Sequence, residues 1–96
     1  MSLLSSDEIT QALGGMPGWQ LADRAIQKVY TFASFPEAVA FVTRLVPGAE
    51  AADHHPDLAI AYTRVTVTYA THSEGGITAK DLAGARAADA CAGAAA

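Results

Sequence analysis

Cysteine is nearly absent from this chain, which has one thiol, Cys91, among its 96 residues. One thiol cannot form an internal disulfide, and this favours a reducing environment. No apolar run reaches the length of about 18 residues that a membrane-spanning helix needs, and no basic segment followed by an apolar run marks a secretory signal. We therefore expect a cytoplasmic protein without a membrane span, in which Cys91 is an inert small residue rather than a nucleophile.

Clustered positive charge is also missing. The six Lys and Arg residues are dispersed, ten Asp and Glu residues outnumber them, and the formal net charge is −4. Nucleic-acid binding needs clustered basic residues, so this composition argues against it. Apolar residues make up 51% of the chain, which is high for a small monomer and indicates a buried subunit interface. The length fits one domain over residues 1–96, whose modest core would benefit from oligomerisation.

Three segments carry the signature of a helix start, a hydroxyl residue followed three positions later by an acid: Ser5 with Glu8, Ser34 with Glu37, and Thr78 with Asp81. The first helix should stop at Gly14-Gly15. The second should be interrupted at Pro47-Gly48, because a proline inside a helix costs about 3 kcal/mol, and should end near His54, because Pro56 disfavours helical geometry at His55. The third leads into an alanine-rich C-terminus whose last residues we expect to fray.

Between the helices, residues alternate as they do in strands: segments 19–21 and 26–32 form one pair, and 58–62 and 64–70 the other. One strand face carries three apolar residues together with a lysine: Ile26, Lys28, Tyr30 and Phe32. By the same parity Val65, Val67 and Tyr69 face the core, and His72 lies on the opposite face of the sheet.

The element order helix-strand-strand-helix-strand-strand-helix predicts an α+β fold, with a four-stranded antiparallel sheet and three helices packed on one face. Core packing is the expected role of four aromatic residues, Trp19, Phe32, Phe35 and Phe41.

Two of the three histidines are adjacent, within Asp53-His54-His55-Pro56-Asp57, and the third, His72, follows the last strand. Histidine is the side chain whose ordinary pKa, about 6.5, lies closest to neutral pH. Glu50 and His54 are four positions apart, which places them on one helix face, so Glu50 is expected to hold one imidazole nitrogen of His54. We expect the imidazoles to share a single hollow, backed by Glu50 and Asp53.

Three chemistries compete for these residues. Histidines with carboxylates are ordinary ligands of zinc or iron, but adjacent histidines do not match the usual ligand spacing. Nucleophilic catalysis is weaker, because no serine lies in a Gly-x-Ser-x-Gly turn and Cys91 has no histidine near it in sequence. General acid-base catalysis without a metal or cofactor needs only histidines poised near neutral pH, and it is the preferred interpretation.

The motif is similar to that of the pterin-4a-carbinolamine dehydratases. The resemblance extends from about Trp19 to about Ala87, and four segments carry it: 49–50, 53–57, Thr71-His72 and Gly76-Ile77-Thr78 with Lys80-Asp81. It implies dehydration of 4a-hydroxytetrahydropterin to quinonoid dihydropterin and water, within tetrahydrobiopterin recycling. It also implies a metal-free site that needs no cofactor.

Carried over to this chain, the resemblance makes His54 and His72 the acid-base pair, His55 mainly a substrate contact and Glu50 the orienting carboxylate. Further pterin contacts would come from Asp53, Pro56, Thr71 and Asp81. For Asp81 the alternative is a helix cap.

Family members form dimers or tetramers, so the resemblance implies a homo-oligomer, with a functional link to an aromatic amino acid hydroxylase that supplies the substrate. Family members also act in assembly, and a fold alone does not fix a function. The alternative is therefore a non-catalytic binding or assembly protein on the same fold.

Overall fold

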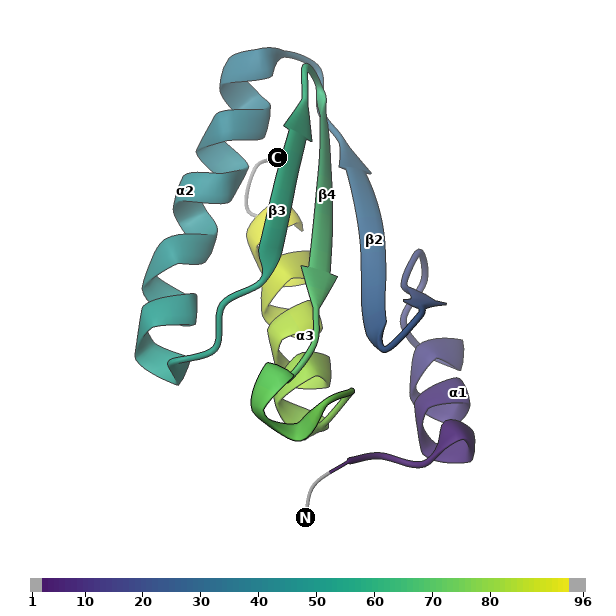
Figure 1. Cartoon of the computed structure of the whole chain (residues 1–96). Coiled ribbons are helices and arrows are strands. Elements are labelled where there is room, and N and C mark those ends of the chain that lie inside the picture. Colours follow the sequence, from purple (N-terminus) through teal and green to yellow (C-terminus); the bar gives the residue numbers. More distant parts are fainter. Residues whose placement is uncertain (1–2, 94–96) are drawn as a thin grey trace.

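The computed structural model describes residues 3–93, and its elements follow the predicted order. The elements are α1 (Ser6–Gly14), β1 (Gln20–Ala22), β2 (Ala25–Thr31), α2 (Phe35–Ala52), β3 (Asp57–Ala61), β4 (Arg64–Tyr69), the short 3-10 helix η1 (His72–Glu74) and α3 (Ala79–Gly93) (Figure 1). The expected fraying of the last alanines lies outside the described residues. None of the described helices is long and apolar enough to span a bilayer.

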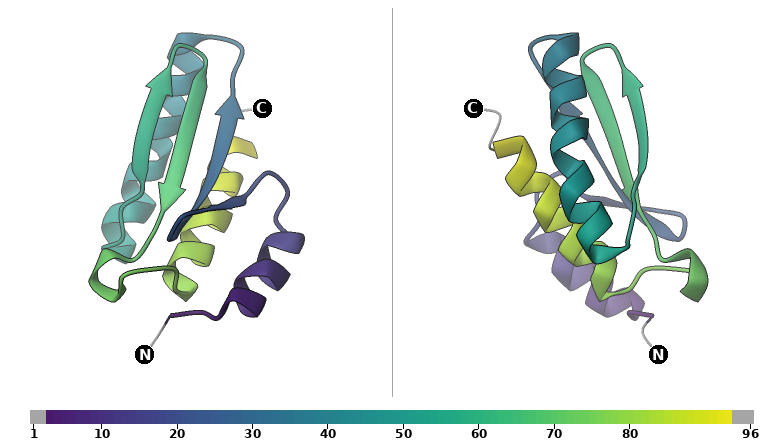
Figure 2. Two further views of the ribbon diagram at one scale, coloured as in Figure 1. Left: turned by 45° about the vertical axis from the view of Figure 1, so that its right-hand side comes forward. Right: turned by 90° about the vertical axis from the view of Figure 1, so that its left-hand side faces the viewer.

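The four strands form one antiparallel sheet in the order β1-β2-β4-β3. In the central pair, β2 lies antiparallel to β4, and the paired residues run from Ile26 with Tyr69 to Thr31 with Arg64. Both views in Figure 2 show α2 and α3 side by side over one face of the sheet, with the other face open. The predicted α+β fold, with helices on one face of a four-stranded antiparallel sheet, is therefore confirmed.

The core lies between the sheet and these two helices. Alternate residues of the central strands point into it, and Ile26, Val65 and Val67 are fully buried together with Phe41 of α2. Trp19 and Phe32 also belong to the core or pack against it. The prediction for Phe35 is wrong: it is the first residue of α2 and remains 48% exposed.

Helix α2 continues through Pro47 to Ala52, so the predicted interruption is wrong. Proline removes one backbone donor, but the other backbone hydrogen bonds of the helix remain, and the buried residues Ala38, Phe41 and Leu45 hold the turns before it against the core. The chain leaves the helix at Asp53, which adopts the left-handed conformation with φ of 50°. The end of the helix is therefore two residues before the predicted position near His54.

The first capping box is confirmed, since Ser5 and Glu8 exchange both hydrogen bonds. In the second, the Ser34 hydroxyl accepts from the Glu37 backbone N–H, but the Glu37 carboxylate accepts from the N–H of Ala33 instead of that of Ser34. That box is half formed, because the carboxylate reaches one residue further back.

A polar cluster attaches α3 to the sheet. The Asp89 carboxylate accepts hydrogen bonds from the Trp19 indole at 3.1 Å, from Lys28 Nζ at 2.9 Å and from the Tyr30 hydroxyl at 2.5 Å. Burial alone would raise the pKa of Asp89, but these three donors and the charge of Lys28 outweigh burial and lower it. The cluster explains why a lysine lies on the core face of β2.

Candidate active site

His54 lies just after α2, and its ring reaches the first turn of α3. Its Nε2 atom is 2.6 Å from Oδ1 of Asp81, and the ring stacks on Tyr69 with centroids 6.0 Å apart. The imidazole is 11% exposed and the Asp81 side chain is fully buried. The two residues are 27 positions apart in sequence, so the fold alone brings them together.

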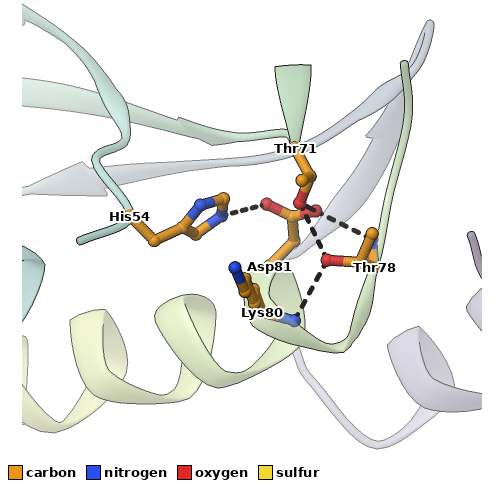
Figure 3. Close-up of polar contacts among 5 residues, drawn as sticks. All are labelled: His54, Thr71, Thr78, Lys80 and Asp81. Atoms are coloured by element: carbon orange, nitrogen blue, oxygen red, sulfur yellow. Dashed lines mark hydrogen bonds and ion pairs between the residues drawn. The ribbon is translucent and has the colours of Figure 1, made fainter. Parts of the chain in front are cut away.

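Asp81 is held by a short chain of hydrogen bonds (Figure 3). Its Oδ2 atom accepts from the Thr71 hydroxyl at 2.8 Å and from the Thr78 backbone N–H at 2.9 Å. The two threonine hydroxyls are 2.8 Å apart, and that of Thr78 accepts from the Lys80 N–H at 3.2 Å. Because the Thr71 hydroxyl donates to Asp81, it must accept from the Thr78 hydroxyl. The hydrogen bonds therefore all point the same way, from the Lys80 N–H to Thr78, from Thr78 to Thr71 and from Thr71 to the carboxylate. Every polar atom of this buried cluster is thereby satisfied.

The network fixes the tautomer of neutral His54. An ionised carboxylate only accepts hydrogen bonds, so Nε2 of His54 must carry the proton that lies between it and Asp81. Nδ1 is then the nitrogen with a free lone pair, on the side of the ring away from Asp81 in Figure 3. A buried aspartate also orients the catalytic histidine of serine proteases, although there it accepts the proton of Nδ1 instead of Nε2.

Glu50 holds the other histidine of the pair. Its Oε2 atom is 2.6 Å from Nε2 of His55, and both side chains are more than half exposed. The predicted pairing of Glu50 with His54 is therefore wrong. It assumed that His54 would continue the helical spacing, but the left-handed Asp53 turns the chain so that His54 points toward α3 and His55 back along α2.

His72 opens η1 and is exposed, on the sheet face opposite the helices as its parity predicted. It lines a hollow of about 340 Å³ together with Asp57, Thr68 and Arg24. His54 lines a different cavity, between α2 and α3, and His55 lines a third hollow with Pro56, at the edge of β3.

The expectation that the three imidazoles share one hollow is therefore wrong. They surround the junction of β3, β4 and the end of α2 from three sides: His54 beneath the sheet, His55 at its edge and His72 on its open face. Strand parity predicted the face for His72, but it could not predict that the αL turn at Asp53 directs the adjacent histidines apart.

The other predicted residues lie in three places. Thr71 and Asp81 belong to the buried network, and Pro56 lies beside His55. Asp53 terminates α2 through its backbone. Thr78, predicted only as a cap, is also part of the network, a role that its spacing to Asp81 could have suggested. Among residues 3–93, no three His, Cys, Asp or Glu side chains are grouped as metal ligands would be.

Tyr69 belongs to the hydrophobic core and also contacts this network, because its ring stacks on His54. Burial of its ring, with smaller contributions from Cys91 and Asp81, raises the pKa of Tyr69 to about 12. The phenol therefore stays neutral across the physiological range, and it provides an uncharged surface for the His54 ring.

The structure is that of a small α+β protein with a buried histidine–aspartate pair. The family model described as "Pterin 4 alpha carbinolamine dehydratase" matches residues 2–91, and the chain belongs to this family. Two similar bacterial proteins are provisionally named pterin-4-alpha-carbinolamine dehydratases. The one from Cyanothece sp. is 49% identical over 83% of this chain and 82% of its own length, and the one from Chloroflexus aurantiacus is 46% identical over 93% and 96%.

Two solved structures are similar to the fold. A protein from Brucella melitensis, described as a transcriptional coactivator/pterin dehydratase, superimposes with a TM-score of 0.89 at 42% identity, over 93% of this chain and 97% of its own. A pterin dehydratase-like protein, described as a RuBisCO assembly factor of the alpha-carboxysome, superimposes with a TM-score of 0.63 at 26% identity, over 78% and 87%.

Proposed function

We propose that this protein is a dehydratase that converts 4a-hydroxytetrahydropterin to quinonoid dihydropterin and water. The observation that carries the proposal is the buried His54–Asp81 pair, in a chain that belongs to the pterin carbinolamine dehydratase family. A buried carboxylate that binds an imidazole through one oxygen and is held in place through the other is typical of a site that transfers protons.

The reaction needs one proton delivered and one removed. An imidazolium donates a proton to the 4a-hydroxyl, the C4a–O bond breaks and water leaves. The N5 proton passes to a base, and the electron pair of the N5–H bond forms the C4a=N5 double bond. Atoms and charge balance without an oxidant, so general acid-base catalysis is sufficient.

His54 and His72 are the proposed acid-base pair. Asp81 positions His54, whereas Glu50 positions His55, which contacts the substrate. Thr71 contributes through Asp81, and Asp53 and Pro56 shape the turn that carries the two histidines. His72 lies on the open face of the sheet, whereas His54 lies beneath it. A pterin in contact with both would therefore span the sheet edge near Asp57.

We further propose that the protein is a cytoplasmic homodimer or homotetramer acting in tetrahydrobiopterin recycling, with an aromatic amino acid hydroxylase as the source of its substrate. Strand β3 supports the oligomer, because it is an edge strand whose five residues are all exposed, Leu58 and Ile60 by 38% and 41%. An exposed apolar edge of this kind is usually covered in a stable protein.

The test is the rate of carbinolamine loss, followed by absorbance after the substrate is generated in place, and compared with the spontaneous rate. Wild-type protein should accelerate the reaction. His54→Ala or His72→Ala should each slow it by about 10²-fold, as expected for the loss of a general acid or base. Retention of full activity by both variants would contradict these roles.

The second candidate is a binding or assembly protein. It is favoured by the structural similarity to a pterin dehydratase-like RuBisCO assembly factor. A folded, oligomeric wild-type protein that leaves carbinolamine loss at the spontaneous rate would support this role over the catalytic one.

A further inference from the structure

The cavity between α2 and α3 is separate from the hollows that His55 and His72 line. Its volume is about 210 Å³. Half of its lining residues are glycines and alanines of the two helices, including Gly48 and Ala49 of α2 and Ala83 and Ala87 of α3. Small side chains on facing helices leave space between them, and a cavity of about 150 Å³ with apolar walls admits one benzene ring in another protein. This cavity is large enough for a one-ring ligand.

The polar side chains around the cavity are cationic or neutral. Arg44 and Lys80 line it, and no Asp or Glu is among the described residues that do. His54 lies at one end, where its Nε2 atom is engaged by Asp81. Two positive charges border this apolar cavity, that of Arg44, which is held by a hydrogen bond, and that of the exposed Lys80, and together they are complementary to an anion.

Arg44 has an unused donor. Its Nε atom donates to the Cys91 carbonyl at 3.0 Å, near the end of α3. Its Nη2 atom is buried and has no hydrogen-bond partner in residues 3–93. Nζ of Lys80 likewise forms no ion pair within that range. Buried guanidinium nitrogens normally have an acceptor, and a carboxylate is the acceptor whose geometry a guanidinium fits best.

We propose that this cavity binds a small carboxylate with an apolar body of about one ring, its carboxylate facing Arg44 and Lys80 and its body lying against the small residues of α2 and α3. Apart from His54, whose ring lies at one end of the cavity, the site shares no residue with the pterin contacts proposed above. Its test measures binding instead of turnover, so its failure would not affect the proposed dehydratase activity.

Benzoate and its neutral isostere benzamide are the probes. Cys91 lines the cavity and is the only thiol in the chain, so its alkylation by iodoacetamide reports occupancy. Benzoate should bind saturably and slow the alkylation of Cys91. Benzamide should bind at least about tenfold more weakly, because it lacks the charge that strengthens the hydrogen bonds of the guanidinium.

Three variants locate the site. Arg44→Met should weaken benzoate at least about tenfold, since it removes a charge-assisted donor. Arg86→Met is the matched control, because Arg86 is an exposed residue of α3 outside the cavity, and it should leave binding unchanged. Gly48→Leu should fill the cavity and abolish binding, and it should fold, because a Cβ at Gly48 has no atom within 4 Å. It therefore tests the site even if Arg44→Met is unstable.

Several results would overturn the proposal. These are equal affinity for benzoate and benzamide, equal benzoate binding by the two arginine variants, or no protection of Cys91 at saturating benzoate. Protection of Cys91 by a neutral pterin but not by benzoate would assign the cavity to the pterin. A change in oligomeric mass in Gly48→Leu, without benzoate binding to wild type, would assign it to a subunit contact.

Discussion

Gly84 of α3 lies directly against the ring of Tyr69 on β4, so closely that a Cβ atom on Gly84 would be 2.5 Å from Cε1 of the ring. Glycine is normally unfavourable in a helix interior. Here it allows the helix to approach the sheet at the position where Tyr69 also supports His54. The packing of α3 and the geometry of the site are therefore linked.

Gly84→Ala should destabilise the fold. The added methyl group must displace a buried ring, and overpacking costs about 1–3 kcal/mol, which exceeds the gain of up to about 1 kcal/mol in helix propensity. Gly48→Ala is the matched control in α2, because nothing lies within 4 Å of its Cβ, and it should stabilise by about 0.5–1 kcal/mol. Urea denaturation measures both. Equal stabilisation by the two changes would show that the close approach does not exist.

Asp89→Asn should reduce stability most at neutral pH. Hydrogen bonds from Tyr30, Lys28 and Trp19 outweigh burial and lower the pKa of Asp89 from its ordinary value of 3.8. A lowered pKa in the folded state gives stability that is present above pH 3.8 and is lost as the pH falls through the folded pKa. The difference in unfolding free energy between wild type and Asp89→Asn should therefore shrink below about pH 4.

The measurement is a series of urea unfolding curves across the acid range. Glu74→Gln, at an exposed position of η1, is the control and should change little. A difference between wild type and Asp89→Asn that stays constant down to pH values well below that range would rule out the linkage.

Tyr69→Phe should make the protein less sensitive to alkali. Burial raises the pKa of Tyr69 from 10.0 to about 12, so its contribution to stability is complete below pH 10 and is lost as the pH rises through about 12. Burial and the Asp89 hydrogen bond raise the pKa of Tyr30 as well, in the same direction. Wild-type stability should fall across this range, and that of Tyr69→Phe should fall less steeply. Tyr62→Phe, at a position that is 74% exposed, is the control for loss of a hydroxyl group. Parallel pH profiles for wild type and Tyr69→Phe would contradict the assignment.

The tautomer of His54 can be observed directly. In wild-type protein at a pH where the ring is neutral, the ¹⁵N shifts of His54 should identify Nε2 as protonated and Nδ1 as unprotonated, because Asp81 accepts the Nε2 proton. Asp81→Asn should weaken this preference, whereas Glu50→Gln should alter the shifts of His55 alone. A wild-type His54 with its proton on Nδ1 would be incompatible with the network.

Local sequence patterns were sufficient to predict most of the fold. Capping residues begin the helices, and alternation in the strands fixed which of their residues face the core, including the open face for His72. Phe35 shows the limit, because helical periodicity does not determine whether the first turn of a helix packs on the core.

The site was less predictable for two physical reasons. The left-handed turn at Asp53 ended the helical spacing that would have paired Glu50 with His54. The partner that His54 has instead, Asp81, is distant in sequence and becomes a neighbour only when α3 packs on the sheet. The position of Lys28 could have predicted one contact of α3. A lysine at a core-facing strand position requires a carboxylate partner, and that partner is Asp89.

If pterin dehydration depends on the buried pair of His54 and Asp81, the turnover of Asp81→Asn should differ from that of Glu50→Gln. Both proteins are first shown to be folded by circular dichroism at the assay temperature. Asp81→Asn should lower kcat by about tenfold or more, because His54 loses the group that orients it, and Glu50→Gln should lower it by less than about threefold. Full activity in Asp81→Asn, or the larger loss in Glu50→Gln, would contradict the account.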